Sequence, residues 1–359
     1  MKEYMVSSFA LILGITALLT AVSFAFLHPI LRLMQIPADV YGMMYDYMWI
    51  ILFGLPFIFL YNFFAFLLRS VGNSVTPLVF LGVSTVLNIG LDYVFVAVFD
   101  WNVEGAAIAT VLSQIISGIG IAVYSFAKET VLRLKREELR VNGGILGEIF
   151  SYSAATGIQQ SVMNFGILMV QGLVNSFGTA VMAAFAAGVK IDTLAYMPAQ
   201  EFGNAYSIFI SQNYGAGKKD RIRKGSKSAV IVVLVFCLAA SAAVFILARQ
   251  LMGIFIAPEE TGIIHIGAGY LRVEGACYCG IGILFLLYGY FRAVEKPKVS
   301  LLLTIISLGT RVVLAYAFAP VFGVGAIWWA IPIGWALADV TGTALIRTVG
   351  AGSRQGSQI

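Results

Sequence analysis

Ten stretches of mostly apolar residues, each about 20 residues long and so able to cross a bilayer as a helix, follow one another along this chain. Apolar residues occupy all faces of these stretches, without the alternation of a barrel strand, so they predict helices. Hydrophobic residues make up 60% and charged residues 11% of the 359 residues, which excludes a water-soluble domain. The stretches lie near residues 7–27, 45–67, 77–99, 105–126, 147–174, 180–210, 228–248, 265–291, 299–319 and 325–347.

The basic residues alternate in number between successive connections. If the N-terminus is cytoplasmic, 18 of the 23 Lys and Arg residues fall in cytoplasmic segments, and only Arg32 and Arg249 fall in outer loops. Lys190, Arg272 and Arg311 lie within spans. The positive-inside rule then predicts that both termini are cytoplasmic. The net charge of +5 therefore reflects topology, and we expect no nucleic-acid partner.

The second half of the chain repeats the first at a nearly constant offset. Four segments match at offsets of 221, 223, 223 and 220 residues: Pro37-Ala38-Asp39 with Pro258-Glu259-Glu260, Tyr47 with Tyr270, Leu68-Arg69 with Phe291-Arg292, and residues 103–106 with 323–326. Internal repeats of this kind are typical of secondary transporters. The repeat pairs the first four spans with the last four and leaves the fifth and sixth without counterparts.

The repeat also predicts how the chain divides. We expect an all-α polytopic membrane protein with ten transmembrane helices in two pseudo-symmetric bundles of four and six, derived from a twelve-helix architecture whose first two helices would precede Met1. The predicted parts are an incomplete N-terminal lobe over residues 1–127, a charged cytoplasmic linker over 128–144, a C-terminal lobe over 145–348 and a cytoplasmic tail over 349–359.

A stripe of side-chain amides marks the fifth span. Gln160, Asn164, Gln171 and Asn175 fall within about 60° of one another on a helix of 100° per residue. They are candidates for a substrate or ion cavity. Hydrogen bonding between helices, which is common in membrane bundles, is an equal alternative for the amides alone.

The sixth span carries a second polar face. Lys190, Glu201 and Asn204 lie on it, whereas Asp192 points elsewhere by helical spacing. Ionisable groups within a bilayer are costly and commonly mark cavities or relays, so a cavity role is favoured for Lys190 and Glu201. A structural ion pair with another helix is the alternative.

Four further spans carry intramembrane polar groups. Asn88 and Asp92 share a face of the third span, and Glu274 opens the eighth. We count all three as cavity candidates, with a structural, cap-like role as the alternative for Asp92. Arg311 needs an acceptor within the membrane, and Asp339 of the last span is a candidate partner.

The remaining reactive residues argue against catalysis. Cys237, Cys277 and Cys279 all lie within spans, which favours packing over a disulfide or zinc site. His28 and His265 lie at outer helix ends, and no tight cluster of His, Asp and Ser is evident. We therefore expect no enzyme, catalytic residue, cofactor or bound metal.

Two prolines lie within spans and predict kinks, because each removes a backbone hydrogen bond. These residues are Pro56 in the second span and Pro198 in the sixth. Kinked helices in transporters often flank the substrate cavity, although kinks that serve packing alone are commoner.

Five motifs resemble the multidrug and toxic compound extrusion (MATE) family. The most specific is a Gln-Asn-x-Gly-Ala-Gly cytoplasmic turn within Gln212–Arg221, after the sixth span. The others are Leu68–Pro77, Asn88–Asp92, Glu104–Thr110 and the looser Phe291–Pro297. As a set they are specific, and the resemblance covers essentially the whole chain.

The resemblance implies a twelve-helix fold in two lobes. It also implies a transporter that exports small-molecule organic compounds, which are bulky and often cationic, in exchange for inward-moving sodium ions or protons. It implies that this chain begins at the family's third helix, after a first helix that commonly carries a coupling acid. Where the family's seventh helix often carries a carboxylate, this chain has Gln159, Gln160 and Asn164. We expect a monomer in the lipid bilayer of a bacterial-type inner membrane.

Two alternatives stay open beside an antiporter. A flippase for a lipid-linked substrate would favour several inward basic residues for phosphate, and here only Lys190, Arg272 and Arg311 are candidates. The other alternative is a remnant without transport activity, because the expected first helical pair is missing.

Overall fold

The computed structural model describes residues 2–33, 41–129 and 141–355, and side chains within 2–32, 41–129 and 141–346. These residues form helices and short connections, with no strand among them. The chain divides into two compact units, an N-terminal unit, Met1–Ser151, and a C-terminal unit, Tyr152–Ile359. The helical polytopic fold expected from the apolar stretches is confirmed.

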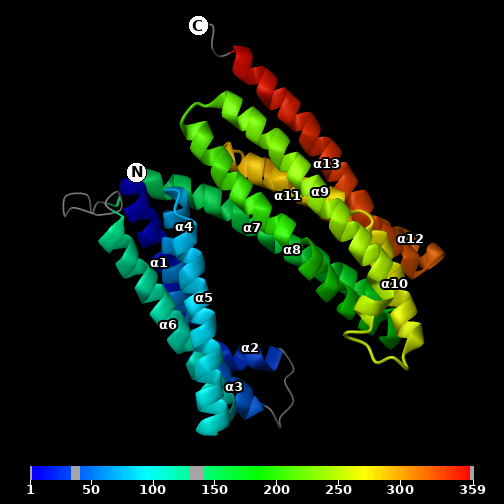
Figure 1. Cartoon of the computed structure of the whole chain (residues 1–359), viewed down its shortest axis with the longest axis horizontal. Coiled ribbons are helices and arrows are strands. Elements are labelled where there is room, and N and C mark those ends of the chain that lie inside the picture. The colour runs from blue at the N-terminus through cyan, green and yellow to red at the C-terminus, as the bar shows by residue number, and fades with distance from the viewer. Residues whose placement is uncertain (1, 34–40, 130–140, 356–359) are drawn as a thin grey trace. The chain divides into compact units, whose positions relative to one another are not determined.

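The N-terminal unit consists of long helices with two short ones, α2 and α3, near the end away from the N-terminus (Figure 1). Helices α4, α5 and α6 pack against one another, and α1 packs against α4. The π-helical turn η1 continues α5 directly. The elements are α1 Lys2–Ala25, α2 Leu27–Leu33, α3 Tyr41–Leu52, α4 Leu55–Ser70, α5 Val75–Asp92, η1 Tyr93–Val98 and α6 Asn102–Lys128.

The C-terminal unit holds the larger apolar core, in which α8, α9, α10 and α11 pack together and α12 packs along α13. Helix α7 begins in the N-terminal unit and continues into this one. The elements are α7 Gly143–Asn175, α8 Thr179–Gly215, α9 Lys219–Met252, α10 Thr261–Gly275, α11 Tyr278–Ala293, α12 Pro297–Phe322 and α13 Val324–Gln355.

Nine of the ten expected spans coincide with helices that are long and apolar enough to cross a membrane, within the described residues. Seven are single helices, and two are bent pairs: α3 with α4, bent by 42°, and α10 with α11, bent by 51°. The remaining expected span is α7, a helix of 33 residues that is not among these candidate spans.

The two bent spans break at equivalent positions of the sequence repeat. Leu52 and Gly275 end the first halves, and Leu55 and Tyr278 begin the second halves, so both boundaries differ by 223 residues. Pro56 lies in the first turn of α4 and accounts for the first break, because proline cannot continue the hydrogen-bond ladder. The second break contains no proline. Helix α8 is continuous through Pro198.

Small residues bring α8 and α11 into backbone contact. A Cβ atom on Gly289 would lie 2.6 Å from the Gly203 carbonyl oxygen, and one on Gly203 would lie 3.0 Å from the carbonyl oxygen of Phe285. Such close approach is the usual mode of helix packing in membranes, where lipid offers no hydrophobic driving force for association.

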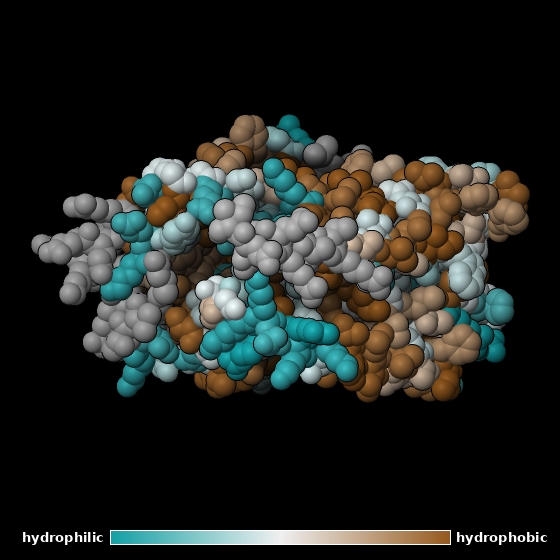
Figure 2. All heavy atoms as spheres, turned by 90° about the horizontal axis from the view of Figure 1, so that it is seen from above, coloured by the Kyte–Doolittle hydropathy of each residue, from teal (hydrophilic) through white to brown (hydrophobic). Residues whose placement is uncertain are grey.

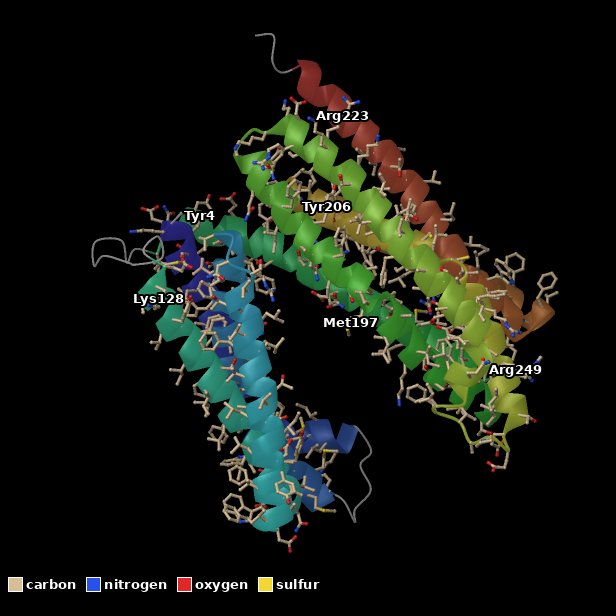
Figure 3. The ribbon with its side chains drawn as sticks, viewed as in Figure 1. Tyr4, Lys128, Met197, Tyr206, Arg223 and Arg249 are labelled. Carbon is tan, nitrogen blue, oxygen red and sulfur yellow. The ribbon has the colours of Figure 1, made fainter. Side chains whose placement is uncertain are left out.

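The surface matches a bilayer environment. Apolar side chains cover much of it (Figure 2), and no residue of the apolar window of Val75–Val98 is buried. In the C-terminal unit, Arg223 and Arg249 lie near opposite ends of α9, which leaves its middle apolar (Figure 3).

Part of the predicted linker, residues 130–140, lies outside the described residues. Its ends are helical: Lys128 closes α6, and Gly143 opens α7. The two compact units meet inside α7, between Ser151 and Tyr152. The division into lobes of four and six helices therefore stays a prediction.

Candidate functional site

Two acidic side chains are buried in the core of the C-terminal unit. Asp192 of α8 is 2% exposed, and Glu274 of α10 is 4% exposed. Asp192 Oδ2 and Glu274 Oε2 accept no hydrogen bond from the described residues. The two carboxyl groups are nevertheless close enough to interact with each other. Buried charges are normally paired, so this arrangement needs a physical account.

Tyrosine hydroxyls surround the two carboxyl groups. The Tyr278 hydroxyl donates a hydrogen bond to Asp192 Oδ1. The Tyr270 hydroxyl faces both carboxyl groups. The break between α10 and α11 produces this geometry, because Glu274 lies just before it and Tyr278 begins the helix just after it.

Aromatic packing fixes Tyr270 in place. Its ring lies 4.9 Å from the Trp328 ring and 5.3 Å from the Phe185 ring, centroid to centroid. The ring rests on Gly188 of α8, where a Cβ atom would lie 2.5 Å from it. The hydroxyl therefore has little freedom to turn away from the acidic pair.

The acidic pair is suited to hold one positive charge. Two carboxylates that face each other in a medium of low dielectric repel, so they do not readily stay ionised together. A proton shared between them, or a small cation bound by the carboxylate oxygens, removes this repulsion. We name Asp192, Glu274, Tyr270 and Tyr278 the acidic cluster.

A cavity of about 250 Å³ lies beside the acidic cluster, and Glu274 and Arg311 both line it. A second cavity, of about 210 Å³, shares part of its lining. The shared residues are Met163, Gln200, Phe285 and Tyr288. Together they form a mixed aromatic and polar space next to a titratable group, the usual character of a small-molecule site.

Some of the residues predicted from the sequence border these cavities. Gln160 and Asn204 line the smaller one. Asn204 accepts a hydrogen bond from an Arg292 Nη atom at 3.3 Å and donates one of 3.5 Å to Glu201. Glu201 itself is exposed. Glu274 is the one predicted carboxylate that the structure buries beside a cavity, among the described residues.

Other predicted residues of this unit lie apart from the cavities. Gln171 donates to Asn175 at 2.8 Å, so these two amides satisfy each other. Asn164 is exposed. Lys190 is exposed as well, and its Nζ atom lies 5.9 Å from the centre of the Phe255 ring. The side chains of the two predicted stripes therefore do not form one continuous lining.

In the N-terminal unit the predicted pair Asn88 and Asp92 lies near the end of α5. Asn88 donates to the Thr110 hydroxyl of α6 at 3.4 Å. Asp92 precedes η1, and its Oδ1 atom is buried without a hydrogen-bond partner in the described residues. Asn88 thus links two helices, whereas Asp92 retains an unused acceptor.

The expected pairing of Arg311 with Asp339 is absent. Arg311 Nε and Asp339 Oδ1 are both buried without a hydrogen-bond partner within the part of the chain that the structure describes. Asp339 instead lies beside the start of α11, where its Oδ2 atom would be 3.7 Å from a Cβ on Gly280. Arg311 faces the cavity that Glu274 also lines.

The sequence singled out Glu274 but did not predict the acidic cluster as a group. Helical spacing places Asp192 off the polar face of its own span, and that observation is correct for a single helix. The cluster arises because α10 and α11 cover the opposite face of α8. An acidic residue alone on an otherwise apolar helical face was the available signal, since it needs a partner from another helix.

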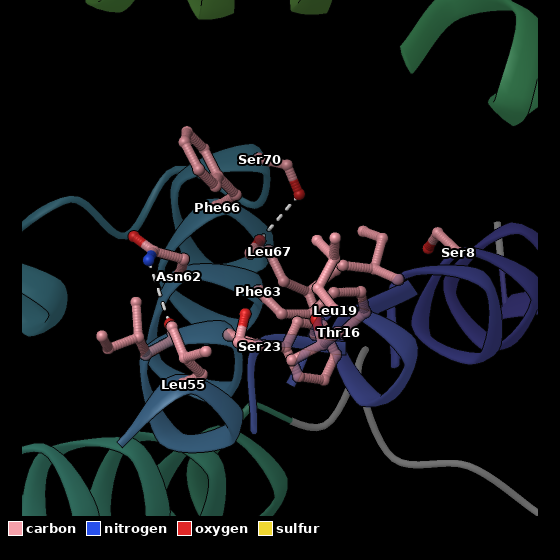
Figure 4. Close-up of a pocket in the computed structure, with 13 residues that line it drawn as sticks. Ser8, Thr16, Leu19, Ser23, Leu55, Asn62, Phe63, Phe66, Leu67 and Ser70 are labelled. Atoms are coloured by element: carbon pink, nitrogen blue, oxygen red, sulfur yellow. Dashed lines mark hydrogen bonds between the residues drawn. The ribbon is translucent and has the colours of Figure 1, made fainter. Parts of the chain in front are cut away.

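A larger apolar groove of about 860 Å³ lies between α1 and α4 of the N-terminal unit (Figure 4). Most of its lining is aliphatic or aromatic. Three of its polar groups bond to the backbone of their own helices: Ser70 to the Leu67 carbonyl, Asn62 to that of Ile58 and Ser8 to that of Met5. The groove therefore offers little directional chemistry.

Comparisons with known proteins agree on one family. The MatE family model matches residues 1–94 and 155–317. The probable multidrug resistance protein YpnP of Bacillus subtilis is 29% identical over 323 residues, which cover 90% of this chain and 71% of YpnP. The probable multidrug resistance protein NorM of Thermotoga maritima is 25% identical over 285 residues, 78% of this chain and 61% of NorM.

Solved structures share the fold. A crystal structure of MATE in the bent conformation superposes with a TM-score of 0.92 and 21% identity, covering 100% of this chain and 80% of that one. At this level of identity the likeness concerns the fold alone.

Proposed function

This chain belongs to the MatE family, and from that premise we propose that it exports small organic compounds across a membrane in exchange for an inward-moving cation. The names of the relatives, multidrug resistance proteins, support the substrate class. The excess of basic residues in alternate connections supports cytoplasmic termini in a cell's inner membrane.

The single observation that carries the coupling proposal is the acidic cluster. Asp192 and Glu274 are buried together without a basic partner among the described residues, so the site is favoured when it holds one proton or one sodium ion. A cation that stabilises one conformation more than the other shifts the balance between them. Loading and release of the cation would thus drive the conformational cycle.

The substrate would occupy the adjoining cavities. Glu274 belongs both to the acidic cluster and to the lining of the larger cavity. A positively charged substrate and the coupling cation would therefore compete for the same carboxylate. Such competition is sufficient for exchange, because each ligand lowers the affinity for the other.

The test is gradient-driven efflux of ethidium from proteoliposomes that contain the 359-residue chain. An imposed proton gradient and an imposed sodium gradient are applied separately, which identifies the coupling cation. We expect Asp192→Asn and Glu274→Gln each to reduce the gradient-driven rate at least about tenfold. Glu259→Gln, in an exposed loop of the same unit, is the matched control.

If gradient-dependent efflux is unchanged in both Asp192→Asn and Glu274→Gln, the acidic cluster does not couple cation movement to transport. Absence of efflux by correctly folded wild-type protein would contradict transport by this chain, which spans 71% of YpnP and 61% of NorM.

A lipid-linked flippase has less support. Lys190 and Arg272 are exposed and lie over the rings of Phe255 and Phe245. Arg311 is thus the one of the three intramembrane basic residues that lines a cavity in the described part of the chain.

A further inference from the structure

We propose that Arg311 makes the larger cavity of the C-terminal unit a site for ligands that carry a carboxylate. The inference rests on the proposed function only in treating that ligand as a transported compound. The binding step itself is independent of transport.

The position of Arg311 is costly unless a partner compensates its charge. It lies midway along α12, at the depth where a guanidinium in a membrane-spanning bundle costs several kcal/mol. Its side chain is half-buried, its Nε atom is buried, and it forms no hydrogen bond or ion pair with the described residues. The guanidinium group of Arg311 therefore has donor groups that no described residue uses, and a bound ligand could accept hydrogen bonds from them.

The available carboxylates do not compensate this charge. Asp339, the nearest candidate by sequence, leaves its own Oδ1 atom unpaired. Glu274 lines the same cavity, but it faces Asp192 and the Tyr270 hydroxyl. Arg311 and Glu274 thus present opposite charges to one space without joining each other.

The fold itself does not require a charge at this position. Arg311 lies 223 residues after Asn88, which is the offset that relates the two bent spans. At that equivalent place Asn88 makes a neutral hydrogen bond to Thr110. A structural role in the repeated scaffold is thus served by an amide, and the guanidinium of Arg311 is an addition specific to the C-terminal unit.

The rest of the lining indicates what else the ligand carries. Trp335, Tyr196 and Phe285 offer aromatic surface, and Gln200 and Thr193 offer hydrogen bonds. A planar guanidinium binds carboxylates through two parallel hydrogen bonds, and an enclosed aromatic setting strengthens them. With volumes of about 250 and 210 Å³, the two adjoining cavities fit an aromatic carboxylate of modest size.

The proposal is tested by equilibrium binding to the purified chain in lipid nanodiscs, measured by calorimetry. The probes share one ring system and differ in charge: indole-3-propionate carries a carboxylate, tryptamine an amine, and tryptophan both. We expect the two carboxylate probes to bind the wild type. Arg311→Gln should weaken both by about tenfold or more, because a hydrogen bond to a charged group is lost. Tryptamine binding should change little.

Two variants separate recognition from folding. Arg311→Lys keeps the charge but loses the bidentate geometry, so it should bind the carboxylate probes with intermediate affinity. Arg272→Gln removes an exposed arginine of the same unit and should bind all probes as the wild type does. Size-exclusion elution and helical circular dichroism establish that each variant is folded.

Equal affinity of wild type and Arg311→Gln for both carboxylate probes would overturn the proposal, and so would failure of both probes to bind folded wild type. Ethidium efflux in the absence of carboxylate binding would leave the proposed transporter intact and remove this role of Arg311. Carboxylate binding without gradient-driven efflux would establish the site and contradict transport.

Discussion

At the scale of single residues, the chemistry of this protein depends on which polar groups the neighbouring helices cover. Asp192 and Glu274 are buried by other helices, whereas Lys190 and Glu201, which share a polar face of α8, stay exposed. Tyr278 donates a hydrogen bond to Asp192 Oδ1 of the acidic pair. Its hydroxyl stabilises the ionised, cation-free carboxylate of Asp192.

We therefore expect Tyr278→Phe to tighten cation binding, because the empty state loses a stabilising donor while the shape of the side chain is kept. The cation concentration that gives half-maximal efflux should fall roughly tenfold. Tyr316→Phe is the control, since this exposed hydroxyl bonds only to the Met169 carbonyl in the described structure. An unchanged half-maximal concentration would mean that Tyr278 has no part in coupling.

The candidate site was predictable from sequence only in part. Glu274 could be singled out because an acidic residue within a span is costly wherever it points. Asp192 could not be joined to it, because helical spacing describes one helix and the pair belongs to two. The tyrosines carried no signal of their own, since tyrosines are frequent in this chain and most of them need no acidic partner.

At the scale of helices, two contacts fix the register of α8 against α11. Asp192 with Tyr278 and Gly203 with Gly289 are both pairs separated by 86 residues, so the two helices run in the same direction and keep the same register at both contacts.

The two helix breaks differ in how well the sequence predicted them. Pro56 predicted the bend between α3 and α4, whereas the bend between α10 and α11 has no proline and follows from packing.

Gly289→Leu should separate α8 from α11, because even a Cβ atom would lie 2.6 Å from the Gly203 carbonyl oxygen. Overpacking of this kind typically costs about 1–3 kcal/mol. We expect a lower melting temperature of the purified protein and loss of efflux. Gly309→Leu in α12 is the matched control, since a Cβ there meets nothing within 4 Å. Equal melting temperatures for the two variants would argue against this contact.

At the scale of the whole chain, the helical character and nine of the ten expected spans followed from apolar length alone, within the described residues. The sequence signal was strong because a bilayer permits few structures. Helix α7 is the exception, since amides interrupt its apolar stretch and it is not among the candidate spans. The orientation rests on a different signal, the distribution of Lys and Arg.

The orientation makes a direct prediction. In a variant whose three cysteines are replaced by alanine, Glu260→Cys should react with a membrane-impermeant maleimide added to intact cells. Lys219→Cys should react only after permeabilisation, because basic connections stay cytoplasmic. The reverse pattern of labelling would invert the topology, and labelling of both in intact cells would contradict the count of spans between them.

The close contact of Gly203 with Gly289 also limits how the protein can move. Helices whose backbones touch at this contact and whose side chains join at Asp192 and Tyr278 are held at two points, so α8 and α11 must travel as one rigid strut. Glu274 lies on the far side of the break, on α10. A change in the separation between the two carboxylates thus requires a hinge movement at Ala276 and Cys277, together with a shift of the Tyr270 ring on Gly188. A cation that draws the carboxylates together would flex that hinge and leave the strut unchanged.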